Sequence, residues 1–453
     1  MTQNTPLIIS ISGIRGIVGQ SLTGAVAGHF AAAFGTWLGA GRTVVLARDP
    51  RPSGEALSQA CAAALQEMGC RVLDLGLCST PGAKLMVTEL GAAGAIILTA
   101  SHNPLPWNGL KMIRGDGIFL NAAQGKEVEA LFHSRAFTPR GGGSLEQVDP
   151  AMVCRLHLER ILAAVDLERI RRARLRVAVD PCNGAGGLLL PQLLQALEVE
   201  AHFIHAEAHG RFAHEPEPVP ANLVDLGQAV RHSRSAVGFA IDPDADRVAL
   251  VGEEGEPVGE DYTLALAVLA IGARRQGSVV TTLSTSQLVS DAAQARQCSV
   301  VLTPVGEVHV VEKMVEVGAV IGGEGNGGVV LTEVDPGRDA ALGVAIVLES
   351  LAQQPLAAWL AQLPHYSIDK RKVSCTPAQL QQALDQLRAQ HPAAFAHPVV
   401  DGVKLYLSGR LECPWVHLRA SNTEPVVRII AESTTSTEAA ALCDEAEELL
   451  KGT

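Results

Sequence analysis

Short apolar runs alternate with alanine- and leucine-rich stretches over most of the chain. Runs such as Thr43–Ala47 and Arg71–Leu75 have the length and residue types of strands, and the stretch between them, from about Glu55 to Met68, has the pattern of a helix. Strands that alternate with helices in this way form largely parallel sheets with helices on both faces. The pattern therefore predicts an α/β fold.

The same succession of a strand, a turn and a helix recurs later in the chain. Leu175–Val179 runs into Asp180-Pro181, as the first strand runs into Asp49-Pro50, and Ser278–Leu283 leads to a serine-rich turn and a helix. We interpret this recurrence as three related α/β domains. Beyond about residue 363 the pattern is of an α+β kind and ends in an amphipathic acidic helix, Thr437–Leu450.

The length of 453 residues is consistent with three or four domains of roughly 150 residues each. We expect α/β domains at residues 1–150, 151–257 and 258–366, and a smaller α+β domain at residues 367–453. The glycine-rich segment Pro139–Ser144 lies near the first of these boundaries.

Composition and charge exclude several classes of protein. Hydrophobic residues make up 47% and charged residues 19% of the chain, which is typical of a folded globular protein. The net charge of −12 argues against non-specific nucleic-acid binding, which needs a basic surface. Nine cysteines without a C-x-x-C pair indicate neither a disulfide framework nor a zinc site. Because there is no signal peptide and no run of about 18 apolar residues, we expect a cytoplasmic protein without a membrane partner.

Three aspartates, Asp242, Asp244 and Asp246, occupy alternate positions between the predicted strands Val237–Ile241 and Val248–Val251. Carboxylates this close repel one another unless a cation or ample water screens them. A hard divalent cation such as Mg²⁺, which prefers oxygen ligands, is the natural partner. The pattern predicts a metal site, and the alternative is an acidic solvated turn.

A calcium-binding EF-hand is a different explanation of the same loop. Glu253 does stand at the twelfth position of such a loop, but Arg247 replaces the glycine required at the sixth. The flanking segments are also strand-like, whereas an EF-hand needs helices. We therefore reject the EF-hand.

Two arginines flank a turn near the C-terminus, in HLRASNTEPVVRI. Arg419 and Arg428, together with donors from Ser421, Asn422 and Thr423, provide the groups of a phosphate-binding loop. An arginine-capped surface turn is equally compatible with the spacing.

A glycine-rich segment, IGGEGNGGVV, carries Glu324 and Asn326 among five glycines. Glycine lets a ligand approach the backbone closely, and a carboxylate and an amide can bond to vicinal sugar hydroxyls. The segment lacks both the dinucleotide-binding glycine pattern and the phosphate-loop lysine. It is either a sugar-binding loop or a tight turn between strands.

The segment LTASHNPLPWNGLKM places Ser101, His102 and Lys111 after the predicted strand Ala95–Leu98. Ser101 lacks the G-x-S-x-G surroundings of an acyl-transfer nucleophile. The ring of the adjacent His102 would point away from the serine hydroxyl, which favours a loop-ordering residue over a base. In a chain that also carries a metal loop and a phosphate-binding loop, phosphoryl transfer fits best, and the alternative is a turn without chemistry.

Together, and in their order along the chain, these motifs resemble those of the α-D-phosphohexomutase family. The resemblance rests on TASHNP at Thr99–Pro104, DPDADR at Asp242–Arg247, GGEGNGG at Gly322–Gly328, RASNTEPVVR at Arg419–Arg428 and SGIRGIVG at Ser12–Gly19. It spans nearly the whole chain. It implies three similar mixed α/β domains and a smaller C-terminal α+β domain around a central cleft.

The resemblance also implies a role for each motif. Ser101 would carry a phosphoryl group in the resting enzyme, and one Mg²⁺ would be held by a phosphoserine oxygen and the three aspartates. Arg247 and Arg15 would lie beside the phosphoryl group, and Glu324 and Asn326 would bind the sugar hydroxyls. Lys111 would be a general acid/base or a phosphate counter-ion. The phosphate that is not transferred would be bound by the loop from Arg419 to Arg428, with Ser421, Asn422 and Thr423.

The implied reaction moves a phosphoryl group between the 6- and 1-positions of a hexose phosphate. Ser101 gives its phosphoryl group to the sugar, a hexose 1,6-bisphosphate forms, and the other phosphate returns to the serine. Hexose 1,6-bisphosphate would also act as activator, closure of the last domain would act as a gate, and the enzyme would be a monomer or a homodimer.

Two departures from the glucose- and mannose-specific patterns bear on the sugar. Asn326 stands where many of those members have serine, and Glu307, after Gly306, stands where they often have histidine. The combination resembles archaeal-type phosphoglucosamine mutases, so we expect Gly306 and Glu307 at the sugar, with the carboxylate near a 2-ammonium group. Glucosamine 6-phosphate and 1-phosphate are the expected pair. The alternatives are glucose or mannose phosphates, a serine- and metal-dependent phosphatase, and a non-catalytic sugar-phosphate-binding protein.

Overall fold

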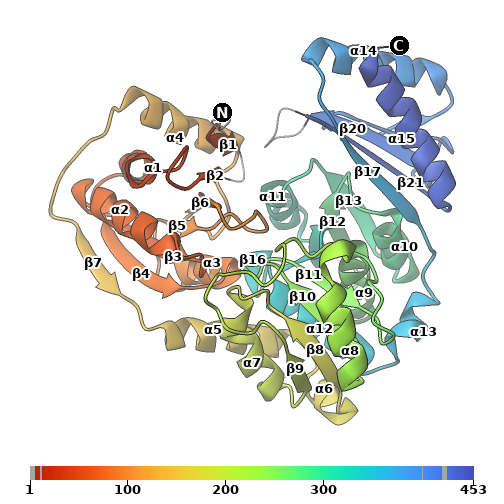
Figure 1. The fold of residues 1–453 in the computed structure, drawn as a ribbon, viewed down its shortest axis with the longest axis horizontal. Coiled ribbons are helices and arrows are strands. Elements are labelled where there is room, and N and C mark those ends of the chain that lie inside the picture. The colour runs from red at the N-terminus through yellow and green to blue at the C-terminus, as the bar shows by residue number, and fades with distance from the viewer. Residues whose placement is uncertain (1–5, 11–12, 400, 421–425, 453) are drawn as a thin grey trace.

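The computed structural model describes residues 6–10, 13–399, 401–420 and 426–452, and these residues form four separate β-sheets with helices packed around them. We number the four units domains I to IV in chain order. Figure 1 shows domain I on the left, domains II and III in the middle, and domain IV at the upper right. Within the described part of the chain, no helix is both long and apolar enough to cross a membrane.

Domain I contains a seven-stranded sheet in the order β1-β2-β6-β5-β3-β4-β7. Strands β5, β3, β4 and β7 are parallel, and β6, β2 and β1 extend the sheet, each antiparallel to its neighbour. The strands are β1 (Ile8–Ser10), β2 (Gly13–Ile17), β3 (Thr43–Arg48), β4 (Arg71–Leu77), β5 (Gly94–Leu98), β6 (Trp107–Arg114) and β7 (Ser144–Gln147), and the helices are α1 (Gly24–Leu38), α2 (Gly54–Glu67), α3 (Thr80–Glu89) and α4 (Ala122–Ser134).

Domain II contains a four-stranded sheet in the order β11-β10-β8-β9, in which only β11 is antiparallel to its neighbour. The strands are β8 (Arg176–Asp180), β9 (Glu200–Phe203), β10 (Val237–Ile241) and β11 (Val248–Val251). The helices are α5 (Pro150–Ala164), α6 (Leu167–Ala173), α7 (Gly186–Ala196), the short 3₁₀ helix η1 (Pro220–Asn222) and α8 (Val224–Ser233).

Domain III contains a five-stranded sheet in the order β13-β12-β14-β15-β16, with β15 and β16 antiparallel to their neighbours. The strands are β12 (Ser278–Thr282), β13 (Ser299–Thr303), β14 (Ile321–Glu324), β15 (Gly328–Leu331) and β16 (Asp335–Arg338). The helices are α9 (Glu260–Arg274), α10 (Gln287–Ala295), α11 (Glu307–Val317), α12 (Ala340–Leu351) and α13 (Leu356–Leu360).

Domain IV is smaller, and its five strands are antiparallel throughout, in the order β17-β21-β20-β19-β18. The strands are β17 (Ser367–Val373), β18 (Phe395–Ala396), β19 (Val403–Tyr406), β20 (Trp415–Ala420) and β21 (Val427–Ser433), and the helices are α14 (Pro377–Gln390) and α15 (Ser436–Lys451). Domain IV has its own hydrophobic cluster between its sheet and its two helices.

One four-strand arrangement occurs in each of the first three domains. In domain I, β3 pairs in parallel with β4 on one side and with β5 on the other, and β6 pairs antiparallel with β5. The corresponding strands are β3 to β6, β8 to β11 and β12 to β15. The predicted fold class, three similar mixed α/β domains with a smaller α+β domain, is confirmed.

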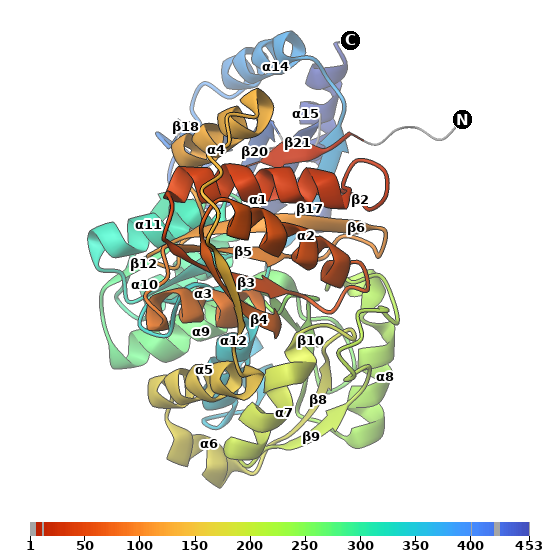
Figure 2. The ribbon, with the colours of Figure 1, turned by 90° about the vertical axis from the view of Figure 1, so that its left-hand side faces the viewer.

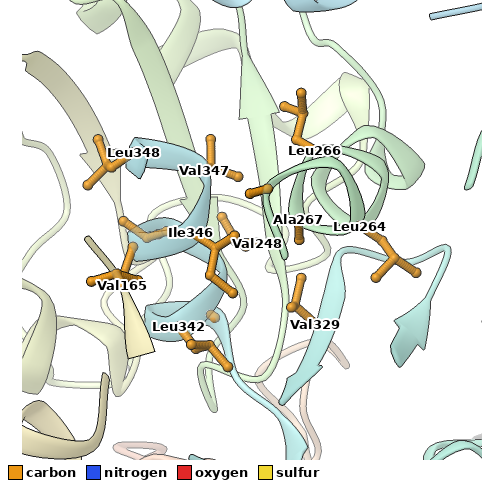
Figure 3. Packing of buried hydrophobic residues seen from close by; sticks show 14 of the residues in the cluster. Val165, Val248, Leu264, Leu266, Ala267, Val329, Leu342, Ile346, Val347 and Leu348 are labelled. Carbon is orange, nitrogen blue, oxygen red and sulfur yellow. The ribbon is translucent and has the colours of Figure 1, made fainter. Parts of the chain in front are cut away.

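Helix α12 lies in a core that domains II and III share. All of its residues are buried, as expected of a helix that is apolar on nearly every side. Val248 and Val329, which directly follow the aspartate loop and the glycine-rich loop, belong to the same cluster (Figure 3). A methyl group on Gly343 of α12 would come within 2.9 Å of Val248 Cγ1 and 3.6 Å of Val329 Cγ2. The helix therefore packs tightly against the start of the strand that follows each loop.

Domain I joins the same body through a second cluster, which combines residues of β3 and β5 with residues of α11. Figure 2 shows domain IV at one end of the molecule, domain II at the other, and domain I between them and facing the viewer. Shared cores of this kind hold domains I to III in fixed relative positions.

Candidate active site

Three of the predicted site loops occupy equivalent places in the fold. The loop with Ser101 joins β5 to β6, the aspartate loop joins β10 to β11, and the glycine-rich loop joins β14 to β15. In each domain the loop connects the third strand of the repeated arrangement to its antiparallel fourth strand. The arginine loop also joins two antiparallel strands, β20 and β21, but domain IV lacks the repeated arrangement.

Ser101 is buried and contacts the aspartate loop of the next domain. Its Oγ donates a hydrogen bond to Asp242 Oδ2 at 2.9 Å, and its backbone N–H donates to Thr99 Oγ1 at 2.9 Å. The φ angle of Ser101 is 49°, in the left-handed region that residues other than glycine rarely adopt. The surrounding structure therefore holds the serine in an unusual conformation, with its hydroxyl on a predicted metal ligand.

Arg51 is the residue that holds this backbone, and the sequence analysis did not identify it. Its guanidinium is fully buried and donates to the carbonyl oxygens of Ser101 at 2.6 Å, Asn103 at 2.7 Å, and Pro104 and Trp107 at 3.0 Å. Its Nε donates to Asp49 Oδ2 at 3.1 Å. An arginine and an aspartate directly after a buried strand were the available signal, because charged residues in such a place need partners.

The aspartate triad of Asp242, Asp244 and Asp246 is fully buried, and one oxygen from each lies within 4.8 Å of the other two. Oδ1 of Asp242 accepts the backbone N–H groups of Asp246 at 3.0 Å and of Arg247 at 3.1 Å, which closes the loop. Among the described residues, Oδ1 of Asp244 and Oδ1 of Asp246 have no hydrogen-bond partner. Buried carboxylate oxygens without partners are unfavourable, and a divalent cation with oxygen ligands would satisfy them, so the triad fits Mg²⁺.

The pKa values of Asp242 and Asp246 are shifted in opposite directions. Burial, with the charges of Asp246 and Asp244, raises the pKa of Asp242 well above its ordinary value. Burial acts in the same direction on Asp246, but Arg338, Lys111 and Arg247 outweigh it and hold the pKa of Asp246 well below its ordinary value. Like charges in one buried site cannot all ionise without a cation. A metal ion in the triad would remove this conflict.

Besides Ser101, domain I supplies two side chains that contact the triad. Lys111, on β6, has its Nζ 2.6 Å from Asp244 Oδ2 and 3.1 Å from Asp246 Oδ2. Thr80, which begins α3 and which the sequence analysis missed, donates to Asp244 Oδ2 at 2.6 Å. Burial would lower the pKa of Lys111, but Asp244 and Asp246 outweigh it and the pKa is raised. Lys111 is therefore a cation here, and its general acid/base role stays a prediction.

Arg247 and Arg15 place further positive charge beside the triad. The Nε of Arg247 lies 3.6 Å from Asp246 Oδ1. Arg15 lies on β2, opposite Gly109 of β6. Burial and the neighbouring Arg247 lower the pKa of Arg15 to about 10, so the guanidinium of Arg15 is still charged at neutral pH. Fixed cations at this point would stabilise a phosphoryl group on Ser101.

His102 lies between domains I and II. Its Nδ1 is 3.4 Å from Ser101 Oγ, at the long end of hydrogen bonding, and its Nε2 is 3.8 Å from Oε1 of Glu217. Burial, with the charges of Arg247 and Arg15, lowers the pKa of His102 well below its ordinary value. A neutral ring held between two loops is compatible with the loop-ordering role expected from the sequence.

The structure brings three of the predicted sugar-binding residues together. Glu324 Oε1 accepts the backbone N–H of Gly306 at 3.2 Å, and Glu324 Oε2 accepts from Asn326 Nδ2 at 3.5 Å. Arg338, at the end of β16, donates from Nη1 to Glu324 Oε2 at 2.6 Å and from Nη2 to Asp246 Oδ2 at 2.7 Å. Arg338, which the sequence analysis missed, thus links the predicted sugar loop to the aspartate triad.

Glu307, at the start of α11, is buried and paired with two cations. Its Oε1 accepts a short hydrogen bond from Lys84 Nζ, and its Oε2 lies 3.0 Å from Nε of Arg338. A sugar ammonium group would therefore share the carboxylate with these two cations. The pairing of Glu307 with a 2-ammonium group stays a prediction.

In domain IV, the two arginines of the predicted phosphate loop lie side by side. Arg419 on β20 and Arg428 on β21 are direct cross-strand neighbours. Both oxygens of Asp401 lie 3.1 Å from Nε of Arg419, and Oδ2 of Asp401 also accepts the backbone N–H of Val305 at 2.8 Å. Asp401 therefore ties the arginine pair to the loop that contains Gly306. The other predicted phosphate ligands, Ser421, Asn422 and Thr423, lie outside the described residues.

A serine hydroxyl, three carboxylates, a lysine and several arginines from domains I, II and III thus meet at one buried point. Such a set can bind a divalent cation and can stabilise a phosphoryl group at the serine.

Models of the phosphoglucomutase/phosphomannomutase family match nearly the whole chain. Alpha/beta/alpha domain I matches residues 8–139, domain II residues 155–255, domain III residues 259–366, and the C-terminal domain residues 372–449. All four parts of the family occur in the expected order.

Curated proteins are also similar over almost their full length. A probable phosphoglucosamine mutase from Methanopyrus kandleri is 34% identical over 96% of this chain and 95% of that protein. A phosphoglucomutase/phosphomannomutase from Thermococcus kodakarensis is 33% identical over 93% of each. A phosphoglucosamine/phosphogalactosamine mutase from Sulfurisphaera tokodaii is 30% identical over 98% of this chain and 99% of that protein.

Solved structures have the same fold. A phosphoglucomutase/phosphomannomutase family protein from Burkholderia thailandensis matches with a TM-score of 0.85 and 29% identity over 98% of both chains. A putative phosphomannomutase from Thermus thermophilus matches with a TM-score of 0.82 and 28% identity over 99% of this chain and 100% of that one. From its four domains, its site and these relatives, we conclude that the chain belongs to the α-D-phosphohexomutase family.

Proposed function

We propose that the chain is a Mg²⁺-dependent phosphohexose mutase in which Ser101 carries the phosphoryl group. The observation that carries the proposal is the 2.9 Å hydrogen bond from Ser101 Oγ to Asp242 Oδ2, which joins the nucleophile of one domain to the metal loop of the next. A phosphoryl group on that oxygen would lie beside the triad, Lys111 and Arg247. Phosphoryl transfer depends mainly on such positioning and on neutralisation of charge.

Mg²⁺, when bound, would be held by Asp242, Asp244 and Asp246 and would withdraw charge from the phosphoryl oxygens. In the first half of the reaction, the bond between phosphorus and Ser101 Oγ breaks and a bond from phosphorus to the sugar hydroxyl oxygen forms. The proton of that hydroxyl has to reach Ser101 Oγ. Because Asp242 would be a metal ligand, Lys111, whose Nζ lies 2.6 Å from Asp244 Oδ2, is the group we expect to move it.

The second half returns the other phosphate of the hexose 1,6-bisphosphate to Ser101, so the sugar has to bind in two orientations. Glu324 and Asn326 offer hydrogen bonds to hydroxyls, and Arg419 and Arg428 offer charge to the distal phosphate. Contacts of this kind recognise a hydroxyl pair and a phosphate, which both orientations present. They support a mutase over a phosphatase, which needs only one orientation.

For the sugar we propose the pair glucosamine 6-phosphate and glucosamine 1-phosphate. The support is the Gly306-Glu307 and Asn326 pattern, together with the relatives from Methanopyrus kandleri and Sulfurisphaera tokodaii whose names include phosphoglucosamine mutase. The relative from Thermococcus kodakarensis, named phosphoglucomutase/phosphomannomutase, favours glucose or mannose phosphates as the second candidate.

The test is a side-by-side assay of the 1- and 6-phosphates of glucosamine, glucose, mannose and N-acetylglucosamine. We expect the highest kcat/KM with glucosamine phosphates, no turnover in Ser101→Ala, and normal turnover in Ser134→Ala, which changes an exposed serine of α4. A preference for mannose would overturn the choice of sugar. Steady release of inorganic phosphate would indicate a phosphatase, and intact protein that never gains a phosphoryl group from a hexose bisphosphate would indicate a non-catalytic binding protein.

A further inference from the structure

Three segments of domain II bring Asp180, His205 and His214 together, apart from the aspartate triad. Asp180 ends β8, His205 lies just beyond β9, and His214 lies in the loop that follows. Asp180 Oδ2 is 3.0 Å from His205 Nδ1 and 3.0 Å from His214 Nε2. One ligand atom from each residue lies within 4.8 Å of the other two. A single carboxylate oxygen is thus approached by two imidazole nitrogens.

The backbone determines which nitrogen of His214 faces the carboxylate. Its Nδ1 lies 2.8 Å from the carbonyl oxygen of Glu215. A carbonyl oxygen can only accept a hydrogen bond, so Nδ1 carries the proton. In a ring that carries only this proton, Nε2 directs a lone pair at the carboxylate oxygen of Asp180, so the contact requires either a second proton on the ring or a metal ion between the two atoms.

The other two groups are also held in place. Oδ1 of Asp180 accepts the backbone N–H of Cys182 at 2.8 Å, which leaves Oδ2 for the histidines. The φ angle of His205 is 47°, in the left-handed region, and its carbonyl oxygen accepts the N–H of Asn183 at 2.8 Å. The Nε2 of His205 faces Asp225 Oδ2 at 3.9 Å. The far nitrogen of His214 is thus hydrogen-bonded to a carbonyl oxygen, as in many metal sites, and a carboxylate lies near the far nitrogen of His205.

We infer that Asp180, His205 and His214 form a second metal site, which binds a first-row transition-metal dication such as Zn²⁺. Two imidazole nitrogens and one carboxylate are a ligand set for Zn²⁺ and similar ions, whereas Mg²⁺ prefers oxygen ligands alone. Ligand atoms about 2.0–2.2 Å from one ion and 3.0 Å apart subtend roughly a right angle at it, which leaves further positions for water. Cysteine spacing gave no sign of this site because none of its ligands is a cysteine.

The position of the site indicates a structural role. The loop that carries His205 and His214 also carries Phe212, whose ring centre lies 4.8 Å from the guanidinium carbon of Arg51. Glu217, three residues after His214, faces His102. An ion that ties this loop to the end of β8 would therefore fix the surface on which Arg51 and the Ser101 loop rest.

The experiment is a titration of the metal-free full chain with Zn²⁺ in competition with a chromophoric chelator. The test variants are His214→Asn, whose amide can still donate to the Glu215 carbonyl, and His205→Gln. The matched control is His209→Gln, an exposed histidine of the same loop. Asp244→Asn weakens binding of Zn²⁺ to the aspartate triad and isolates the second site.

We expect the His214→Asn and His205→Gln variants each to weaken one class of Zn²⁺ site at least 100-fold, and the Asp244→Asn and His209→Gln proteins to keep that class. Co²⁺ should give the visible d–d absorption of a nitrogen-ligated site in Asp244→Asn, and this signal should disappear when His214→Asn is added. Circular dichroism of each variant separates loss of a ligand from loss of the fold.

Equal Zn²⁺ binding in the wild type and in both histidine variants, or no Zn²⁺ binding in Asp244→Asn, would overturn the inference. Either result would show that the two histidines pair with Asp180 through a proton alone. None of these readouts is catalytic, so the outcome is independent of the proposed mutase activity.

Discussion

The Nη2 atom of Arg338 donates a hydrogen bond to Oδ2 of Asp246 at 2.7 Å, and the two residues belong to different domains. Arg338 also pairs with Glu324 and Glu307, so one buried guanidinium contacts three carboxylates. Of these, one is a predicted metal ligand and two are predicted sugar contacts. The geometry of the metal loop and that of the sugar loop therefore depend on a single side chain.

Replacement of Arg338 should affect both loops at once. An Arg338→Lys variant keeps the charge but cannot reach three carboxylates, and we expect a loss of unfolding free energy of about 2–4 kcal/mol and at least a roughly tenfold drop in kcat/KM. Urea unfolding and steady-state kinetics measure the two effects. The control is Arg275→Lys, because Arg275 makes a two-point pair with Glu333 on the surface; there the change should be within about 0.5 kcal/mol. Similar effects in both variants would show that the three-way contact has no special importance.

Mg²⁺ should stabilise the folded protein. The triad holds buried carboxylate oxygens without partners and an Asp242 whose pKa is raised by burial and by its neighbours, so an added dication relieves an unfavourable state. At Mg²⁺ concentrations about 100 times Kd, the gain is about 2.7 kcal/mol, which a thermal-shift assay detects as a rise in Tm. Asp244→Asn should lose most of this rise. If NaCl at matched ionic strength produced the same shift, the effect would be general screening instead of binding.

Arg51 should be needed for catalysis although it does not touch the triad. It holds the Ser101 loop through main-chain carbonyls of Ser101, Asn103, Pro104 and Trp107. Because a lysine has only three N–H donors, Arg51→Lys leaves at least one of these four buried acceptors unsatisfied, and we expect a loss of about 2–4 kcal/mol of unfolding free energy.

Because Arg51 positions the serine and does not bind the sugar, kcat of Arg51→Lys should fall more than KM rises. The control is Arg71→Lys, an exposed arginine paired with Glu146. A change in KM alone would indicate that Arg51 acts on substrate binding.

Asp335 should make stability depend on pH. It is fully buried on β16, and among the described residues neither of its carboxylate oxygens has a hydrogen-bond partner. Burial raises its pKa to about 8, against a weaker opposite effect of Lys84. Between about pH 4 and 8 the unfolded chain loses this proton while the folded chain keeps it, so the contribution of Asp335 to stability falls as the pH rises.

An Asp335→Asn variant cannot titrate and should gain stability relative to the wild type over this range. The gain between about pH 4 and pH 8 should be on the order of 2–5 kcal/mol. Chemical unfolding at several pH values measures it. Parallel stability curves for the two proteins would mean that Asp335 is ionised in the folded state at neutral pH.

Local structure followed closely from the sequence. The strands predicted at Val237–Ile241 and Val248–Val251 have these bounds in the structure, as β10 and β11. The helices predicted near residues 55–68 and 437–450 are α2 and α15, with ends that differ by one residue. Such predictions work because strand and helix periodicities are properties of neighbouring residues.

The contacts that complete the site could not be found in this way. Lys111 and Asp244 are 133 residues apart, and Thr80 and Asp244 are 164 apart. Arg51, Lys84 and Arg338 stand in segments whose local pattern gives only a turn, a helix and a strand end. A buried charge needs a partner, but the partner can come from any segment that packs nearby.

The sequence by itself determined the fold class and the strands and helices around the aspartate loop, and it predicted which residues bind a metal, a phosphate or a sugar, because these follow from neighbouring residues and their chemistry. Only the tertiary structure decided that Ser101 meets Asp242, that Arg338 joins Asp246 to Glu324, and that Asp180 lies between two histidines. Those contacts arise where loops from different strands or domains converge, and their energies depend on burial and on distances that no local pattern contains.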